Sequence, residues 1–145
     1  MWKPPRHLAH LFPPPGCEDV MRWRNNALAR ALHRRDGFCW VGSSECLGFG
    51  SIHEVITRGD VMGWQPPERR LVIYNGINSL KLCSVHHNTA LEPGLVEVFD
   101  WMAEQYGLDV VFGWVTSLKF KGKHPALEWI NGVVSGWGAL DRGLP

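Results

Sequence analysis

His53 and Glu54 stand side by side in the stretch SIHEVITRGD, and this pair is the first place to look for chemistry. In zinc proteases the motif H-E-x-x-H lies on a helix, where two imidazoles one turn apart bind the metal and the glutamate activates water. Here the position four residues after His53 is Thr57, so the motif is incomplete. The three residues after Glu54 are all β-branched, which favours a strand. The sequence therefore excludes this class of protease, and the partners of His53 must come from elsewhere in the chain.

A second set of metal-binding residue types lies on both sides of this pair. Cys83 and His86 are separated by two residues, a spacing that lets both bind one ion across a turn. Upstream, Cys39 and Cys46 offer two more thiolates, although their gap is longer than the two to four residues usual for zinc. The four residues predict a structural Zn²⁺ held by three thiolates and one imidazole. The alternative is a set of buried thiols with His86 on the surface, and Cys17 fits neither.

Three polar residues remain outside this zinc set and could converge on one place. His87 follows His86 directly in NSLKLCSVHHN, so it points elsewhere on the helix expected there. His53 is expected at the end of one strand, and Asn78 lies just before another. His53, Asn78 and the neighbouring Glu54 also have ordinary interpretations. His53 could be a strand-end histidine, Glu54 a solvated strand residue, and Asn78 a turn residue, because N-G-I-N is good turn chemistry.

At these residues the chain resembles a known family, the HNH endonucleases with the ββα-metal fold. In many members two zinc-binding knuckles flank a strand that ends in D-H or H-H, followed by N-L-x-x-L-C-x-x-C-H. The matching text is SIHEVITRG and then NSLKLCSVHHN, with His86 in place of the second knuckle cysteine and a nine-residue step from Asn78 to His87. An H-E-I/V variant followed by R-G is also similar to HNH proteins of tailed bacteriophages. The resemblance covers residues 37 to 91.

The resemblance implies a fold, an activity and partners. The fold is α+β: a ββα-metal (HNH) core with a zinc knuckle, flanked by an N-terminal basic helix and C-terminal helices. The activity is hydrolysis of DNA phosphodiester bonds, by nicking or double-strand cleavage, at a divalent ion (Mg²⁺, Mn²⁺ or Ni²⁺) held by His53 and His87. The amide of Asn78 would orient the site. The partners are DNA and, by analogy with phage packaging, a terminase or portal protein.

The role of general base falls on Glu54, where this chain departs from the D-H or H-H pair. Strict alignment makes His53 a metal ligand and Glu54 the base, which requires a raised carboxyl pKa or a strongly polarised water. If the strand shifts slightly, His53 is the base, and Glu54 is a ligand or a partner that fixes an imidazole. In a third interpretation the domain cleaves weakly or not at all, and is a zinc module that binds DNA or a partner protein.

Positive charge is concentrated near the N-terminus and around the motif. Up to residue 35 the chain has seven basic residues against two acidic ones, which suits an anionic partner. A solvated helix face explains the same charge equally well. Five arginines are candidates for contacts with DNA phosphates: Arg58, Arg69 and Arg70 between the two halves of the motif, and Arg34 and Arg35 upstream.

The remaining pattern divides the first two thirds of the chain into three parts. Residues 1–16 are rich in proline and are expected to form an extended arm. Residues 17–36 predict a basic helix that ends before Gly37, with Met21, Leu28 and Leu32 on its apolar stripe. Residues 37–94 would hold the HNH core, with one strand over SIHEVIT, a long loop, a second strand leading into SLKLC, and a short helix from Cys83 to a Pro-Gly turn.

Residues 95–145 are expected to form a C-terminal extension. Its predicted elements are a helix ending at Gly107, an extended VVFGWV, a basic loop, a short helix over PALEWINGVV and a mobile Gly-rich tail. The sequence pattern does not indicate what this extension does.

The overall composition is that of an ordinary globular protein, with 145 residues, 45% hydrophobic and 20% charged. No apolar run approaches the roughly 18 residues of a membrane span, and the proline-broken N-terminus lacks a signal-peptide core. We therefore expect a cytoplasmic protein (in the host cytoplasm, if phage-encoded) without membrane contact. Structural disulfides are not expected there, so the four cysteines point to metal ligands or buried thiols.

Overall fold

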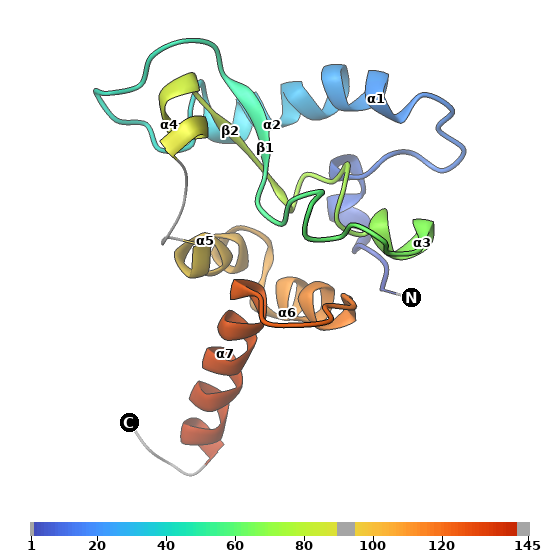
Figure 1. The fold of residues 1–145 in the computed structure, drawn as a ribbon, viewed down its shortest axis with the longest axis vertical. Helices are drawn as coiled ribbons and strands as arrows, with labels where there is room; N and C mark the ends of the chain where they lie inside the picture. Colours follow the sequence, from blue (N-terminus) through green and yellow to red (C-terminus); the bar gives the residue numbers. More distant parts are fainter. Residues whose placement is uncertain (1, 90–94, 142–145) are drawn as a thin grey trace. The chain divides into compact units, whose positions relative to one another are not determined.

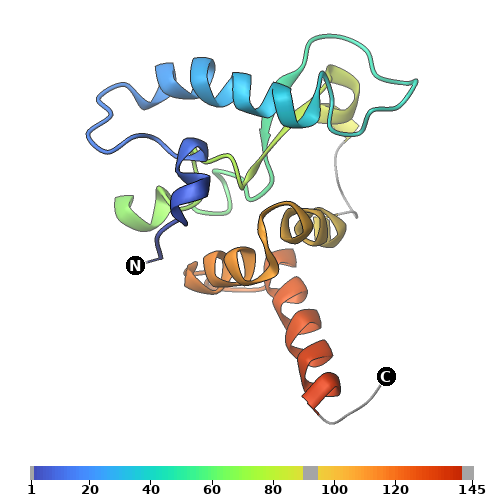
Figure 2. The same ribbon diagram turned by 180° about the vertical axis from the view of Figure 1, so that it is seen from behind.

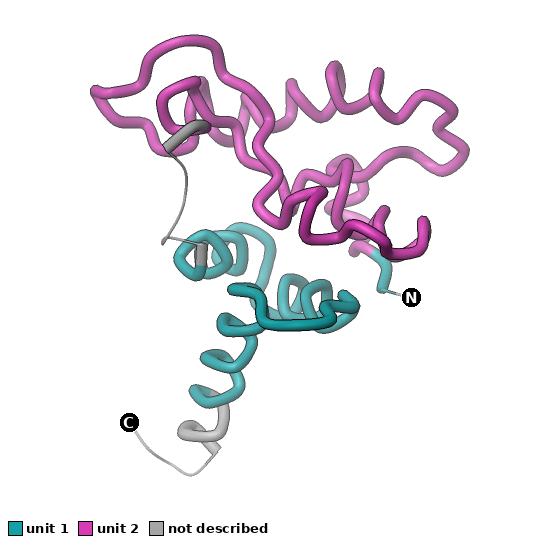
Figure 3. The backbone as a smooth tube through the Cα atoms, viewed as in Figure 1, with its two compact units in different colours: residues 1–3, 93–145 teal, residues 4–92 magenta. Residues whose placement is uncertain are grey.

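The computed structural model describes residues 2–89 and 95–141. The chain divides into two compact units, residues 4–92 and residues 1–3 with 93–145, which we call the N-terminal and the C-terminal unit (Figure 3). Helices and a two-stranded sheet follow one another along the chain (Figure 1), so the expected mixture of α and β structure is confirmed. Within the described ranges, no helix combines the length and the apolar content that crossing a membrane requires.

The sequence predicts that the proline-rich start of the N-terminal unit is an extended arm, and the structure shows that this prediction is wrong. A 3₁₀ helix, η1 (Arg6–Leu11), turns Leu8 and Leu11 into the core, because residues three apart share one face of such a helix. The carbonyl of Leu11 accepts a hydrogen bond from the backbone N–H of Gly76 at 2.6 Å. A Cβ at Gly76 would collide with Leu11, so the glycine permits this close approach.

The basic segment forms a nearly continuous helix, visible along its length in Figure 2. It consists of α1 (Val20–Trp23), a π-helical turn η2 (Arg24–Leu28) and α2 (Ala29–Asp36). Its end agrees with the prediction, because Gly37 follows with a φ of 71° that favours glycine.

The apolar stripe of this helix is only partly as predicted. Leu28 and Leu32 are fully buried, as expected for residues one turn apart. Met21 is 42% exposed, so its predicted place on the stripe is wrong. The π-helical turn between Met21 and α2 changes the angular step between residues, which moves Met21 off the face that Leu28 and Leu32 occupy.

The sheet pairs β1 (Ser51–Glu54) and β2 (Ser79–Leu82) in antiparallel orientation. His53 lies opposite Leu80, and Glu54 lies opposite Ser79. Because successive side chains of a strand alternate, His53 and Glu54 face opposite sides of the sheet.

Both strands are shorter than the sequence predicted, and Asn78 explains where the pairing stops. One further bond runs from the N–H of Val55 to the carbonyl of Asn78 at 2.8 Å. At Ile56 the side chain of Asn78 takes the place of a strand: its Oδ1 accepts from the Ile56 N–H at 2.8 Å, and its Nδ2 donates to the Ile56 carbonyl at 2.9 Å. The residues before β2 form turns, in which Tyr74 has a φ of 60°.

Two short helices complete the N-terminal unit. The predicted long loop contains α3 (Pro66–Arg69), which begins at a pair of prolines, as first-turn prolines allow. Helix α4 (Ser84–Thr89) follows β2 after one residue, where the sequence predicted it. The expected end of this helix, at the Pro-Gly turn, lies outside the described residues.

The C-terminal unit contains α5 (Leu95–Tyr106), α6 (Leu108–Ser117) and α7 (Pro125–Asp141). Helix α5 ends before Gly107 as predicted, but VVFGWV belongs to α6 and is not extended. Likewise, α7 continues to Asp141, well beyond the short helix that was expected. All three helices contribute fully or almost fully buried apolar side chains to one core: Val98, Phe99, Met102, Val111, Trp114, Val115 and Trp129.

Candidate metal centre

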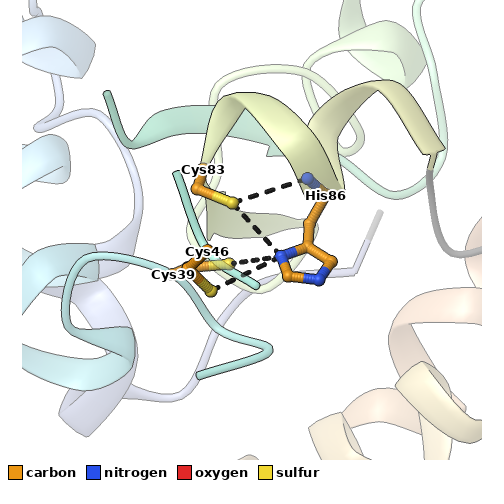
Figure 4. A group of neighbouring side chains, drawn as sticks. All are labelled: Cys39, Cys46, Cys83 and His86. Carbon is orange, nitrogen blue, oxygen red and sulfur yellow. Dashed lines mark hydrogen bonds between the residues drawn. The ribbon is translucent and has the colours of Figure 1, made fainter. Parts of the chain in front are cut away.

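Three thiols and one imidazole come together at one end of the sheet (Figure 4). The ligand atoms of Cys39, Cys46, Cys83 and His86 all lie within 4.8 Å of one another. Nδ1 of His86 is 3.5 Å from the sulfur of Cys39, 3.5 Å from that of Cys46 and 3.1 Å from that of Cys83. A tetrahedral Zn²⁺ with ordinary bond lengths requires S···N separations of about 3.5 Å. The predicted four-residue set is therefore a cluster that could hold a zinc ion.

Backbone hydrogen bonds bring the cysteine loop to β2 and α4. The N–H of Trp40 donates to the carbonyl of Lys81 at 2.6 Å, which places Cys39 beside the end of β2. The carbonyl of Leu47 accepts from the N–H of Ser84 at 3.2 Å and from its hydroxyl at 2.8 Å. These bonds hold the residues next to Cys46 against the start of α4. They explain how a cysteine gap longer than usual still closes one site.

The thiol of Cys83 is prepared for metal binding by its surroundings. Burial acts to raise its pKa, but hydrogen bonds from the backbone at His86 and Leu47 and from the side chains of His86 and Cys39 together lower the pKa to about 6. Burial, by contrast, raises the pKa of Cys46. A thiol with a lowered pKa is more readily ionised near neutral pH, and the thiolate is the form that binds Zn²⁺, so the surroundings of Cys83 suit a zinc ligand.

His87 lies outside the cluster and approaches β1. Its ring and that of His53 are nearly perpendicular, with centroids 5.3 Å apart. Two imidazoles that bind one ion at about 2.1 Å have ring centres roughly 4.5–5.3 Å apart, so this separation fits a shared divalent ion. Burial first, and the charge of His87 second, lower the pKa of His53, which favours the neutral form that metal binding requires. His87 is exposed, so the pair is accessible from solvent.

Asn78 is fully buried and holds the segment that follows His53 and Glu54. Besides its two bonds to Ile56, its Nδ2 donates to the carbonyl of Val72 at 2.9 Å, so one amide ties the end of β1 to the turns before β2. Asn75 in turn positions Asn78, because its Oδ1 accepts from the Asn78 N–H at 2.7 Å. All polar atoms of the Asn78 side chain are occupied, so it contributes to the site by positioning the backbone and not by touching a ligand.

Glu54 lies on the other face of the sheet, between two arginines. Its Oε1 is 3.8 Å from Nε of Arg24, and its Oε2 is 3.6 Å from Nε of Arg58. The Glu54 side chain is only 9% exposed. In the part of the chain that the structure describes, Glu54 does not join His53 and His87 in a compact group of metal-binding side chains. The carboxylate is therefore placed to fix Arg24 and Arg58, not to share an ion with both imidazoles.

The five arginines predicted to contact DNA differ in what they do. Arg34, Arg58, Arg69 and Arg70 are exposed. The guanidinium of Arg58 also lies 5.3 Å from the ring centre of Tyr74. Arg35 is different, because its side chain is only 14% exposed and binds Asp36 at 2.6 Å and the carbonyls of Gly76 and Ser79. The prediction that Arg35 contacts DNA is therefore contradicted: its donors hold α2 against the sheet.

The sequence marked Arg24 only as one of several basic residues of the helix that could contact DNA, and gave no reason to expect its contact with Glu54. Arg24 lies at the start of the π-helical turn, thirty positions before Glu54, and neither residue type nor spacing marks the pair. The available signal was general: wide turns within α-helices occur frequently at functional sites, but they cannot be recognised from composition.

Comparisons of the chain with protein-family models, with curated proteins and with solved structures found no match.

Proposed function

We propose that the protein is a metal-dependent endonuclease of the HNH type that hydrolyses DNA phosphodiester bonds. The observation that carries this proposal is the approach of His53 and His87 beside a Cys₃His cluster, at the spacing of two ligands of one ion. A closed four-ligand set next to a two-ligand set with open positions corresponds to a structural ion beside a reactive one. The zinc cluster alone would support many binding modules, whereas the histidine pair supports hydrolysis.

The order of elements supports the same proposal. The strands β1 and β2 pair in antiparallel orientation, and one residue after β2 the helix α4 begins. This helix carries both His86 and His87. Adjacent positions on a helix point about 100° apart, so α4 can present one imidazole to the zinc cluster and the other to β1. A ββα-metal core needs this arrangement, and the resemblance of the two sequence motifs to the HNH family is consistent with it.

In this proposal the residues of the chain have separate roles in metal binding, in positioning the backbone and in phosphate contact. His87 would hold the divalent ion, with His53 either as a second ligand or beside the ion as the base, and Asn78 fixes the backbone that follows His53. A bound divalent ion would neutralise charge at the scissile phosphate and lower the pKa of an attacking water. Exposed Arg58 would contact a phosphate next to the cut, held in place by Glu54.

Two assignments of the general base follow from the sequence, and the geometry favours His53. Glu54 faces away from His87 and is paired with two arginines, which disfavours a carboxylate that takes a proton from water beside the ion. The lowered pKa of His53 keeps its imidazole neutral, and thus able to accept a proton, at neutral pH. In this assignment His53 uses its one lone pair for the proton and does not bind the ion, which His87 would hold; if His53 and His87 share the ion, the base must be another group.

The test is a plasmid-nicking assay on zinc-loaded protein with Mg²⁺, Mn²⁺ and Ni²⁺ added in turn. We expect metal-dependent nicking that His87→Ala reduces by about 100-fold or more, the usual scale for a lost catalytic group. His10→Ala is the matched control, because His10 is also exposed but lies in η1. Both variants should retain one zinc per chain. Nicking that survives in His87→Ala would contradict the proposal.

A second function is favoured by one observation, the pairing of Glu54 with Arg24 and Arg58. If this carboxylate replaces a catalytic group, the domain would bind DNA or a protein without cutting. No nicking with any of the three ions, from protein that retains zinc and binds a duplex, would establish this alternative.

A further inference from the structure

We propose that the outer face of the helix η2–α2, together with Lys81 of β2, forms a groove that binds the phosphate backbone of duplex DNA, apart from the place where His53 and His87 meet. That the polyanion is DNA rests on the proposed function. The groove itself rests on its own geometry and charge.

The groove is shallow and encloses about 500 Å³. Its walls are polar or basic side chains around one small residue: Asn25, Asn26, Ala29, Arg30, His33, Arg34 and Lys81. None of the described residues that line the groove has a carboxylate. A strand of alternating sugars and phosphates is a ligand of opposite charge.

The helix produces this face because of its spacing. Asn26, Arg30 and Arg34 recur every four residues and form one row, and Asn25, Ala29 and His33 form a second row beside it. Leu28 and Leu32 lie on the opposite side and are fully buried, so they fix which face remains outside. The small side chain of Ala29, in the middle of the two rows, leaves the hollow.

The cations of the groove are not paired with any carboxylate of the described residues. In the described part of the chain, Arg30, Arg34 and the ammonium of Lys81 make no ion pair. Arg30 and Arg34 are separated by about 6 Å of helix rise, which allows them to contact neighbouring phosphates of one strand. Each such contact releases bound counterions from DNA, and this is the usual source of affinity without sequence preference.

The groove is connected to the proposed nuclease site by one chain of contacts. Asn25 accepts a hydrogen bond from Nη1 of Arg24 at 3.3 Å. Arg24 in turn lies 3.8 Å from Glu54, the neighbour of His53 on β1. DNA bound along the helix would thus lie next to the arginine that Glu54 holds. An anionic membrane is a poorer occupant, because insertion requires apolar side chains and the lining offers only the methyl group of Ala29.

The test measures binding without cleavage, in the His87→Ala background. A fluorescently labelled 30-base-pair duplex is titrated with protein across a series of salt concentrations. The groove variant is Arg30→Gln/Arg34→Gln/Lys81→Gln, in which glutamine keeps most of each aliphatic stem. The matched control, Lys119→Gln/Lys121→Gln/Lys123→Gln, removes the same charge from three exposed lysines of the C-terminal unit. Zinc content and the thermal midpoint show that both variants are folded.

We expect the groove variant to weaken binding at low salt by at least about tenfold and to reduce the slope of log K against log salt by about two to three, since each phosphate contact contributes about 0.9. The control should leave the slope unchanged. Equal losses on two unrelated duplex sequences support backbone contact. Equal effects of groove variant and control, no effect of the groove variant, tighter binding to RNA, or capture by anionic vesicles would each overturn the proposal.

The two proposals can fail separately. Loss of duplex binding in the groove variant, combined with no nicking by wild-type protein, would support the groove and refute the nuclease. In active protein, the same groove variant should raise KM for duplex DNA and leave kcat unchanged, because none of its residues contacts the reacting atoms. A groove variant that lowers kcat at saturating DNA would overturn the assignment as a remote binding surface.

Discussion

The two units of this protein are stabilised in different ways. The C-terminal unit uses three helices of 12, 10 and 17 residues, which bury large apolar side chains such as Phe99 and Trp114. The N-terminal unit uses strands of four residues each and several short helices. At its centre lie the buried polar residues Asn75, Asn78 and Ser79, and at its edge lies the Cys₃His cluster. Both units bury apolar side chains, but the N-terminal unit adds buried amide hydrogen bonds and a cluster that could hold a metal ion.

This difference determines where chemistry can be built. An isolated two-stranded hairpin is marginally stable in water, so β1 and β2 need other elements to hold them in place. Buried amides and a metal cluster provide fixed distances and directions, which a catalytic or binding site requires. The C-terminal helices offer stability but, within the described residues, no compact group of three or more metal-binding side chains.

Removal of zinc is expected to produce the largest difference between the stabilities of the two units. Structural Zn²⁺ contributes about 10–16 kcal/mol of apparent binding free energy, more than a small unit's whole stability. We expect a strong chelator, or Cys83→Ser, to unfold the N-terminal unit while the helices of the C-terminal unit persist. Circular dichroism, together with NMR of the indole N–H groups, would measure this.

The control for zinc removal is Cys17→Ser, since Cys17 lies outside the cluster. That variant should retain one zinc per chain and wild-type stability. A chelator that leaves both units folded would show that the N-terminal unit does not depend on metal, and the contrast between the units would be lost.

Trp114→Ala should destabilise the C-terminal unit and leave the N-terminal unit folded. Trp114 is fully buried in the core of the C-terminal unit, and truncating such a residue costs about 3–5 kcal/mol. We expect the thermal transition of the C-terminal unit to fall, with zinc content unchanged, as measured by calorimetry and metal analysis. Trp114→Phe should lose much less. Release of zinc by the alanine variant would show that the two units are not independent.

Asn78→Ala tests the polar organisation of the N-terminal unit. The change leaves the N–H and the carbonyl of Ile56 without the amide partners that they now have. Each buried group left unsatisfied costs about 1–3 kcal/mol, so with two such groups the N-terminal unit should lose about 2–6 kcal/mol in denaturant unfolding. Nicking should fall as well, because β1 carries His53. A variant with wild-type stability would mean that water replaces the amide without cost.

The sequence predicted the members of the Cys₃His cluster because their chemistry is visible in residue type. Cysteine and histidine at a chelating spacing indicate a metal, and all four predicted ligands lie in the cluster. The end of the basic helix at Gly37 and the end of α5 before Gly107 were equally predictable, since glycine at a helix end has a backbone reason.

The elements that the sequence did not predict depend on tertiary contacts. VVFGWV is predicted to be extended, and five of its six residues are β-branched or aromatic, yet Val111, Trp114 and Val115 are buried at helical spacing in α6. The residue types near Asn78 do not indicate that its side chain would bind the backbone of Ile56 and so end the pairing of β1. The inward turn of Arg35 likewise depends on carbonyls that lie more than 40 positions away.

Glu54→Gln has the smallest expected effect on stability and the most informative effect on activity. The carboxylate is 3.6–3.8 Å from two guanidinium groups, without a direct hydrogen bond to either, and Arg58 is half exposed, so the loss should be about 1 kcal/mol. If Glu54 positions Arg24 and Arg58 while His53 accepts the proton, nicking should fall less than tenfold, and Arg24→Gln should reproduce that loss. A loss of 100-fold or more with intact stability, absent from Arg24→Gln, would instead make Glu54 the base. The polar face of the sheet that α2 covers would then take part in the chemistry, and not only in its support.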